Sequence, residues 1–224
     1  MSPSQIVLGG CLLAFGASFL NTGFLLTAGT SVSHLTGDIA RMGSGLSALG
    51  NPDGFPILNV TTAALGFVSG ATISGFLLHH PTLEIGKPYG RTLSALGVFL
   101  MGAHFCRASH PLLAIAIASA VCGVQNALAS RYRGTVLRTT HLTGLFTDFG
   151  IHLGMRLRGH RVEGWKLLIP VCITLAFLIG AAAGAFVVSN DRGNWLFLAG
   201  AGYLVGGVSW SVYKRVGNPG PRRT

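Results

Sequence analysis

Six long apolar runs set the strongest limit on how this chain can fold. They cover residues 5–27, 55–78, 91–106, 112–130, 165–188 and 195–213. A helix needs roughly 20 predominantly apolar residues to cross a bilayer. Turn signals such as Asn51-Pro52-Asp53-Gly54 separate the runs. The pattern predicts an all-α membrane protein with six transmembrane helices.

The composition agrees with a membrane protein and disfavours other classes. Charged residues make up 10% of the chain, whereas a soluble domain has about a quarter. The net charge of +10 lies in short basic clusters between apolar runs, so we expect no nucleic-acid partner. The four cysteines form no CxxC pair and predict no zinc site. No Lys or Arg precedes the first run, which we interpret as a retained helix.

A short polar phrase occurs twice, 107 residues apart. The first copy is His34-Leu35-Thr36-Gly37 and the second is His141-Leu142-Thr143-Gly144. An asparagine, Asn21 or Asn126, precedes each copy near the end of an apolar run. The same order of elements, one helix, one phrase and two further helices, is therefore expected in both halves of the chain. We expect two repeats, residues 1–109 with a re-entrant segment at 30–47 and residues 110–213 with one at 134–155, then a basic cytoplasmic tail at 214–224.

The distribution of Lys and Arg indicates whether the phrases cross the membrane. If neither phrase crosses, 13 of the 16 basic residues lie on the side of the N-terminus, leaving Arg41, Arg107 and Arg192 opposite. If both cross, the split is 10 against 6. The positive-inside rule favours six spans with both termini cytoplasmic, in the inner (plasma) membrane. Three spans per repeat is an odd number, so the two repeats must be inverted relative to each other.

Each phrase is then expected to form a re-entrant unit, an extended strand followed by a half-helix. The seven residues from Thr27 to His34 reach at most about 23 Å, and half of the hydrocarbon core is about 15 Å. About twelve helical residues after His34 rise roughly 18 Å, which returns the chain to the same surface. Ser33 and Thr140, or the neighbouring histidines, are candidate N-caps.

Two half-helix N-termini that face each other at the midplane would favour an anion. Polar side chains around them would complete a substrate site, and the histidines can carry a proton near neutral pH. Asp38 and Asp148, one and two turns beyond their histidines, are candidates for proton coupling. The alternative is that these groups lie near the membrane interface and only satisfy local backbone. The candidate substrate-binding residues are Asn21, His34, Thr36, Gly37, Gln125, Asn126, Arg138, Thr140, His141, Thr143 and Gly144.

Other chemistries have weaker signals. His34, His104, His141, Asp38 and Asp148 are suitable metal ligands, but no HExxH or similar spacing organises them. We therefore expect no metal and no cofactor. No GxSxG or P-loop is present, which argues against an enzyme and against ATP-driven pumping.

At these residues the chain resembles the YoaK-like family of bacterial membrane proteins, defined by domain of unknown function 1275. The matching stretches are Asn21-Thr22-Gly23-Phe24, the first phrase through Asp38, Gly123-Val124-Gln125-Asn126-Ala127, and Arg138-Thr139-Thr140 with the second phrase. The resemblance implies an inner-membrane protein with six or seven spans and supplies no substrate. In the family pattern an acidic residue often stands at the position of Asn21 and an asparagine at that of Asp38. At the level of architecture alone, the plan is similar to that of sulfate-permease-type transporters.

These features predict a small secondary transporter with its site at the midplane. The expected substrate is a small anion or a polar metabolite that bears a carboxylate. A non-transporting scaffold or accessory subunit and a channel are the alternatives. Besides the lipid bilayer, we expect a second copy of the chain as partner. Gly66-xxx-Gly70 and Gly180-xxx-Gly184 are candidate contacts of that homodimer.

Overall fold

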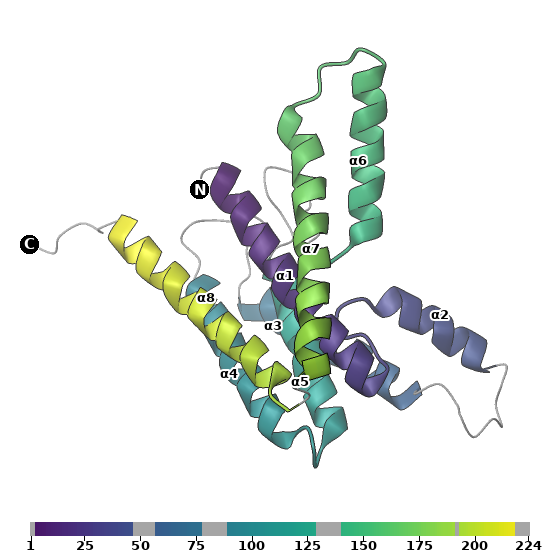
Figure 1. Ribbon diagram of the computed structural model, residues 1–224, viewed down its shortest axis with the longest axis vertical. Helices are drawn as coiled ribbons and strands as arrows, with labels where there is room; N and C mark the ends of the chain where they lie inside the picture. The colour runs from purple at the N-terminus through teal and green to yellow at the C-terminus, as the bar shows by residue number, and fades with distance from the viewer. Residues whose placement is uncertain (1–2, 47–56, 78–88, 129–139, 191–192, 218–224) are drawn as a thin grey trace, which may run out of the picture.

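The computed structural model describes residues 3–46, 57–77, 89–128, 140–190 and 193–217 (Figure 1). All regular structure in these ranges is α-helical. The helices are α1 (Pro3–Ala28), α2 (Leu35–Leu46), α3 (Ile57–Leu77), α4 (Tyr89–Cys106), α5 (Pro111–Leu128), α6 (Leu142–Leu157), α7 (Gly164–Asn190) and α8 (Trp195–Gly217).

The six apolar runs appear as α1, α3, α4, α5, α7 and α8, while the two phrases open α2 and α6. Within the described ranges, five helices are long and apolar enough to cross a membrane: α1, α3, α5, α7 and α8. Helix α4 is not one of them because Arg91 and His104 lower its mean hydropathy. With 12 and 16 residues, α2 and α6 are too short to span. The fold is therefore that of a helical, multi-pass membrane protein.

The long helices associate as three pairs: α1 with α7, α3 with α5, and α4 with α8. Glycines at each interface show the directions. Along α1 and α7, Phe15 meets Gly180 and Phe19 meets Gly184, so these helices run parallel. Helices α3 and α5 are also parallel, since Gly66 meets Ala116 and Gly70 meets Ala120. Helices α4 and α8 are antiparallel, with Gly90 against Gly207 and Gly97 against Gly200.

The glycines let the helix backbones approach closely. A Cβ on Gly66 or Gly70 would collide with a carbonyl oxygen of α5, and one on Gly180 or Gly184 with a carbonyl oxygen of α1. Such contacts are typical of packing between membrane helices. Because both Gly-xxx-Gly pairs are used inside the chain, they cannot form the dimer contact that we expected from them.

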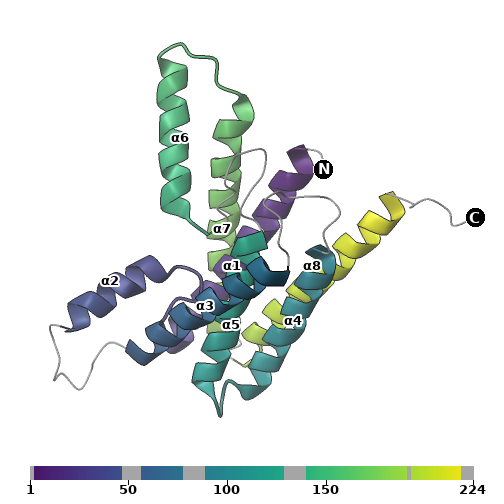
Figure 2. The same cartoon turned by 180° about the vertical axis from the view of Figure 1, so that it is seen from behind.

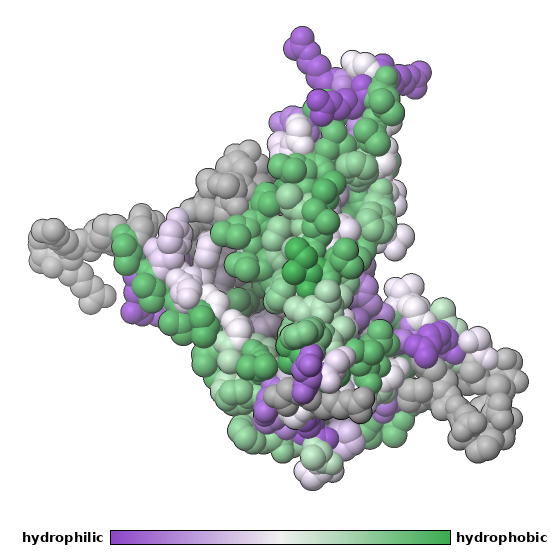
Figure 3. All heavy atoms as spheres, in the orientation of Figure 1, coloured by the Kyte–Doolittle hydropathy of each residue, from purple (hydrophilic) through white to green (hydrophobic). Residues whose placement is uncertain are grey.

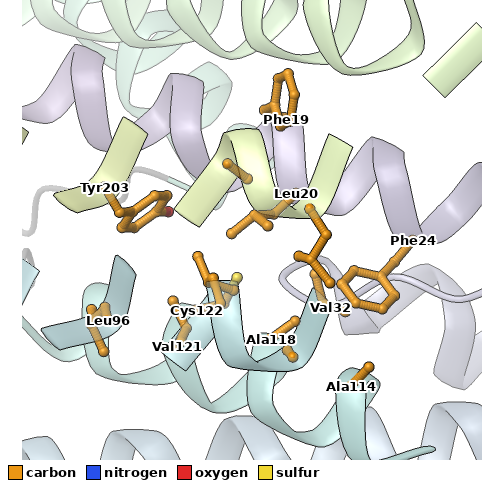
Figure 4. Packing of buried hydrophobic residues seen from close by; sticks show 14 of the residues in the cluster. Phe19, Leu20, Phe24, Val32, Leu96, Ala114, Ala118, Val121, Cys122 and Tyr203 are labelled. Atoms are coloured by element: carbon orange, nitrogen blue, oxygen red, sulfur yellow. The ribbon is translucent and has the colours of Figure 1, made fainter. Parts of the chain in front are cut away.

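The main apolar core lies where α1, α4, α5 and α8 meet (Figure 4). Leu20 of α1 points toward Ala118 and Cys122 of α5 across it, while Phe19 projects from the opposite side of α1. A smaller cluster joins α6 and α7 to α1. Large apolar side chains also cover much of the exterior, as Figure 3 shows over the long helices. An exterior of this kind suits contact with lipid.

Helix α1 ends at Ala28 because Gly29 takes a positive φ of 68°, a common C-terminal helix signal. The expected strand after it does not form. Residues 29–34 are irregular, and side chains rather than a neighbouring strand bind their backbone N–H groups. The corresponding stretch before the second phrase, 134–139, lies outside the described residues. Helix α8 extends past the expected boundary at 213 to Gly217.

The α3–α5 contact gives a direct test of the packing. Gly70→Ala would push the two backbones apart, so we expect a loss of about 1–3 kcal/mol in the free energy of unfolding. Gly75→Ala on the same helix is the matched control, because its Cβ would meet no atom within 4 Å. Thermal unfolding of the purified protein in detergent measures both. Equal melting temperatures for the two variants would contradict this packing.

Candidate functional site

The two phrases meet in the middle of the molecule. The His34 ring lies beside the backbone of Thr140 and within electrostatic reach of His141. Helices α2 and α6 start here and leave toward different ends of the molecule, as both views show (Figures 1 and 2). Residues that are 107 positions apart in sequence thus share one location.

Helix α7 gives the depth of this location. The rings of His34 and Phe177 pack edge to face, with centroids 4.8 Å apart. Phe177 is the central residue of the 27-residue helix α7, about 20 Å from either end. His34 therefore lies halfway along a helix of membrane-spanning length.

Asn21 holds the end of the irregular segment in position. Its Oδ1 atom accepts hydrogen bonds from the backbone N–H groups of Val32 and Ser33 and from the Ser33 hydroxyl, each at 3.1 Å. Asn21 is buried, so these backbone groups would otherwise lie unsatisfied in a dry interior. The Ser33 hydroxyl is also 3.0 Å from Nδ1 of His34. Asn21 thereby fixes the residue that contacts the histidine.

Asp38 holds the start of the same segment from the other side. Its carboxylate accepts hydrogen bonds from the Ser31 N–H at 2.5 Å and the Thr30 hydroxyl at 3.3 Å. The exposed Arg41 is 3.5 Å from its other oxygen. Asp38 is 3% exposed and lies in the first turn of α2, where a carboxylate is favoured by the helix dipole. In the structure this predicted proton-coupling residue acts as a fixed anchor.

The second phrase repeats part of this arrangement. The Thr140 hydroxyl donates to Oδ1 of Asn126 at 2.9 Å, as the Ser33 hydroxyl does to Asn21. His141 is the N-cap residue of α6, but its side chain makes no capping hydrogen bond. The position equivalent to Asp38 holds Leu145, which packs in the apolar cluster with Ile169 and Ile173. The two units are therefore alike in their hydroxyl–asparagine contact and differ in their carboxylate.

Gln125, a predicted substrate ligand, instead connects three helices. It is fully buried, donates from Nε2 to the Leu13 carbonyl at 2.7 Å, and accepts from the Tyr203 hydroxyl through Oε1. Both ends of the amide are thus engaged by α1 and α8.

The other predicted site residues are less enclosed. Thr36, Gly37 and Thr143 are exposed and Gly144 is half-buried in the first turns of α2 and α6. Asp148 is half-buried further along α6. Arg138 lies outside the described residues. Among the residues that the structure does describe, no three His, Cys, Asp or Glu side chains come together in a way that would hold a metal ion.

Sequence reasoning missed several contributors. Ser33 was expected as an N-cap, yet its hydroxyl joins Asn21 to His34. Thr30 and Ser31 were not singled out, although a run of small hydroxyl residues in an apolar chain was an available signal. The sequence offers no local sign that Phe177 would cover His34.

The fold and this site define a class: helical multi-pass membrane proteins in which the polar starts of two short helices, far apart in sequence, meet halfway along a long helix. The chain belongs to the family described as "Protein of unknown function (DUF1275)", whose model matches residues 9–209. This match confirms the family that the motifs indicated. Comparison with curated proteins and with solved structures finds no match.

The hydrogen bonds of Asn21 predict its effect on stability. Asn21→Leu conserves volume but leaves the N–H groups of Val32 and Ser33 without their acceptor, which should cost about 2 kcal/mol or more. Asn21→Asp keeps an acceptor but adds a second carboxylate to the segment. Because Asp38 binds the same segment, adding Asp38→Asn should recover stability lost in Asn21→Asp, in line with the exchange that the family resemblance implies. Melting temperatures test this, and a wild-type value for Asn21→Leu would contradict it.

Proposed function

We propose that this protein is a secondary transporter built from two inverted three-span repeats, with a substrate site between the starts of α2 and α6. The substrate is a small anion or a polar metabolite with a carboxylate. The observation that carries the proposal is the meeting of both phrases beside Phe177, halfway along α7. Secondary transporters commonly bind substrate at the midplane between interrupted helices of two repeats.

The helix directions support six spans. If α2 and α6 both turn back, α1 and α7 cross in the same direction, as do α3 and α5, and α4 and α8 cross in opposite directions. These are the observed relations. If both half-helices crossed, α4 and α8 would run parallel. If only one crossed, α1 and α7 would run antiparallel.

The packing also supports an internal two-fold relation. Exchanging the halves converts the α1–α7 pair into the α5–α3 pair and returns α4–α8 to itself, and all three pairs occur. In α4 and α8 the interfacial glycines have equal spacing, Gly90 and Gly97 against Gly200 and Gly207. Exchange converts the Gly90–Gly207 contact into the Gly200–Gly97 contact.

The first turn of α6, which its N-cap side chain does not bind, supports an anionic ligand. The side chain of the N-cap residue His141 makes no capping bond, so it leaves the first-turn N–H groups uncapped from that side. Such groups carry partial positive charge and bind anions. His141 itself is exposed at the start of the helix and can donate a hydrogen bond to a ligand there.

A scaffold and a channel remain the alternative functions, and we retain the homodimer as a prediction. A scaffold does not require a polar centre halfway along its helices. A channel would conduct ions continuously, whereas a carrier moves substrate only as it changes conformation.

Cysteine labelling tests the topology. In a variant without the four native cysteines, Arg41→Cys should react with an impermeant maleimide from outside the cell, because α2 returns to the outer face. His160→Cys, in the α6–α7 turn, should react only after the membrane is opened. Labelling of Arg41→Cys only from the cytoplasmic side would overturn the six-span arrangement.

A thermal-shift screen tests the site. Carboxylates, sulfate and nucleobases should include a compound that stabilises the purified protein, by about 2.7 kcal/mol at 100 times its dissociation constant. His34→Ala and His141→Ala should abolish this shift and uptake into proteoliposomes. His160→Ala, exposed and away from the phrases, is the matched control. Stabilisation by cations alone would remove the anion proposal. Undiminished uptake by both His34→Ala and His141→Ala would contradict the proposed site. Channel-sized currents in planar bilayers would show that the protein is a channel and not a carrier.

A further inference from the structure

A dense basic cluster lies at the turn between α6 and α7. Arg156, Arg158, Arg161 and Lys166 fall within eleven residues, and Glu163 is the only acidic residue between positions 149 and 190. Glu163 pairs with Lys166 at 3.2 Å. The three arginines are exposed, and Figure 3 shows hydrophilic side chains gathered at this end of the α6–α7 hairpin. The turn therefore presents a positive surface that this part of the chain does not neutralise.

The end of α6 does not need the arginine side chains as caps. Basic side chains near a helix C-terminus can bind the last carbonyl groups. Here the backbone binds two of them. The N–H of Gly159 donates to the carbonyl of Arg156 at 3.0 Å, and the N–H of His160 donates to that of Met155 at 3.1 Å. Gly159 makes this reversal possible with a φ of 90°, so the arginine side chains can bind a ligand outside the chain.

Helix α7 gives the depth of the basic surface. Trp165, in its first turn, is twelve residues before the central residue Phe177, which is about 18 Å along the axis. With Phe177 at the midplane, the hydrocarbon core ends at about 15 Å and the headgroup layer at about 20–22 Å. Trp165 thus lies in the headgroup layer, where Trp is favoured, and Nζ of Lys166 is 5.5 Å from the centroid of its ring. The basic surface is therefore level with lipid phosphates.

An apolar stripe on α6 leads to this surface. Phe146, Leu153 and Leu157 are spaced by seven and four residues, so they share one face of the helix. Their exposed fractions are 57%, 38% and 80%. Helix α6 packs chiefly on α7 (Figures 1 and 2), and the chain leaves the stripe uncovered. The stripe ends at the residue before Arg158, so apolar and basic surfaces adjoin as acyl chains and headgroup do in a lipid.

We propose that the α6–α7 turn binds the headgroup of an anionic phospholipid, whose acyl chains lie along the stripe of Phe146, Leu153 and Leu157. The planar guanidinium fork of arginine matches the oxygens of a phosphate. A zwitterionic lipid carries a cation beside its phosphate, and the basic surface repels that cation. Phosphatidylglycerol carries only the negative charge and is the favoured occupant. Binding of this lipid requires that α7 spans the membrane, and it does not depend on transport.

Tryptophan fluorescence of the full-length protein in nanodiscs tests the lipid preference. The chain has three tryptophans. Trp210→Phe removes the one near the end of α8, and Trp195 is 1% exposed, so quenching by brominated lipid reports on Trp165. Brominated phosphatidylglycerol should quench at a lower mole fraction than brominated phosphatidylcholine. Equal quenching by the two lipids would overturn the proposal.

Charge removal locates the binding. Arg158→Gln combined with Arg161→Gln should weaken binding of brominated phosphatidylglycerol about 30-fold, because each basic residue contributes about fivefold. Lys214→Gln combined with Arg215→Gln is the matched control. It removes the same charge from the last turn of α8, which ends on the membrane face where α7 begins. The control should keep the wild-type affinity, and an equal loss in both double variants would show diffuse attraction and no site.

Two further measurements test whether the ligand is a lipid. Glycerol phosphate has the head chemistry of phosphatidylglycerol without acyl chains, and an excess of it should leave the quenching unchanged. Recovery of Trp165 fluorescence would instead assign the arginines to a soluble phosphate. Leu157→Asn should weaken the quenching, whereas Ile151→Asn, exposed on another face of α6, should not. Unchanged quenching in Leu157→Asn would contradict the placement of the acyl chains.

Discussion

The arrangement at the centre of the protein depends on satisfying the backbone of one short non-helical segment. A bilayer offers no water to unpaired N–H groups, so irregular backbone at depth must find partners within the protein. Residues 29–34 find theirs in two side chains, Asn21 on one side and Asp38 on the other. These contacts allow α1 to stop at Ala28 and α2 to start at Leu35. The position of His34 follows from the same contacts.

The long helices around this centre associate by shape. Between apolar helices in lipid, burial of apolar surface gives little advantage, because lipid is equally apolar. Close contact between helix backbones does stabilise the association, and small residues permit such contact. Glycines appear at all three main helix pairs, where the partner is a carbonyl group or another glycine. The same kind of glycine contact occurs in the α1–α7 pair and in the α3–α5 pair.

The sequence predicted the helices well because their signal is local. Runs of apolar residues marked α1, α3, α5, α7 and α8, and even α4 with its Arg91. The phrases predicted the starts of α2 and α6, and the paired asparagines predicted residues near them. The use of each polar residue was harder to predict. Gln125 reads as a site residue, yet Tyr203 and Leu13, distant in sequence, engage it. The glycine pairs were predicted to form a dimer contact, but in the structure they pack against other helices of the same chain. Which helices pack against each other depends on residues far apart in the sequence, and local sequence patterns contain little information about such pairs.

The pairing of α1 with α7 has a consequence for how the protein is made. A ribosome releases α1 first, but its partner begins only at Gly164. During that interval α1 lacks its main helix partner. Contacts this distant in sequence also slow folding, since the intervening chain must be ordered first. The earliest helix is thus among the last to be completed: Asn21 has its partners Val32 and Ser33 close by in sequence, but the surface of α1 that packs on α7 has no partner until translation reaches the C-terminal third.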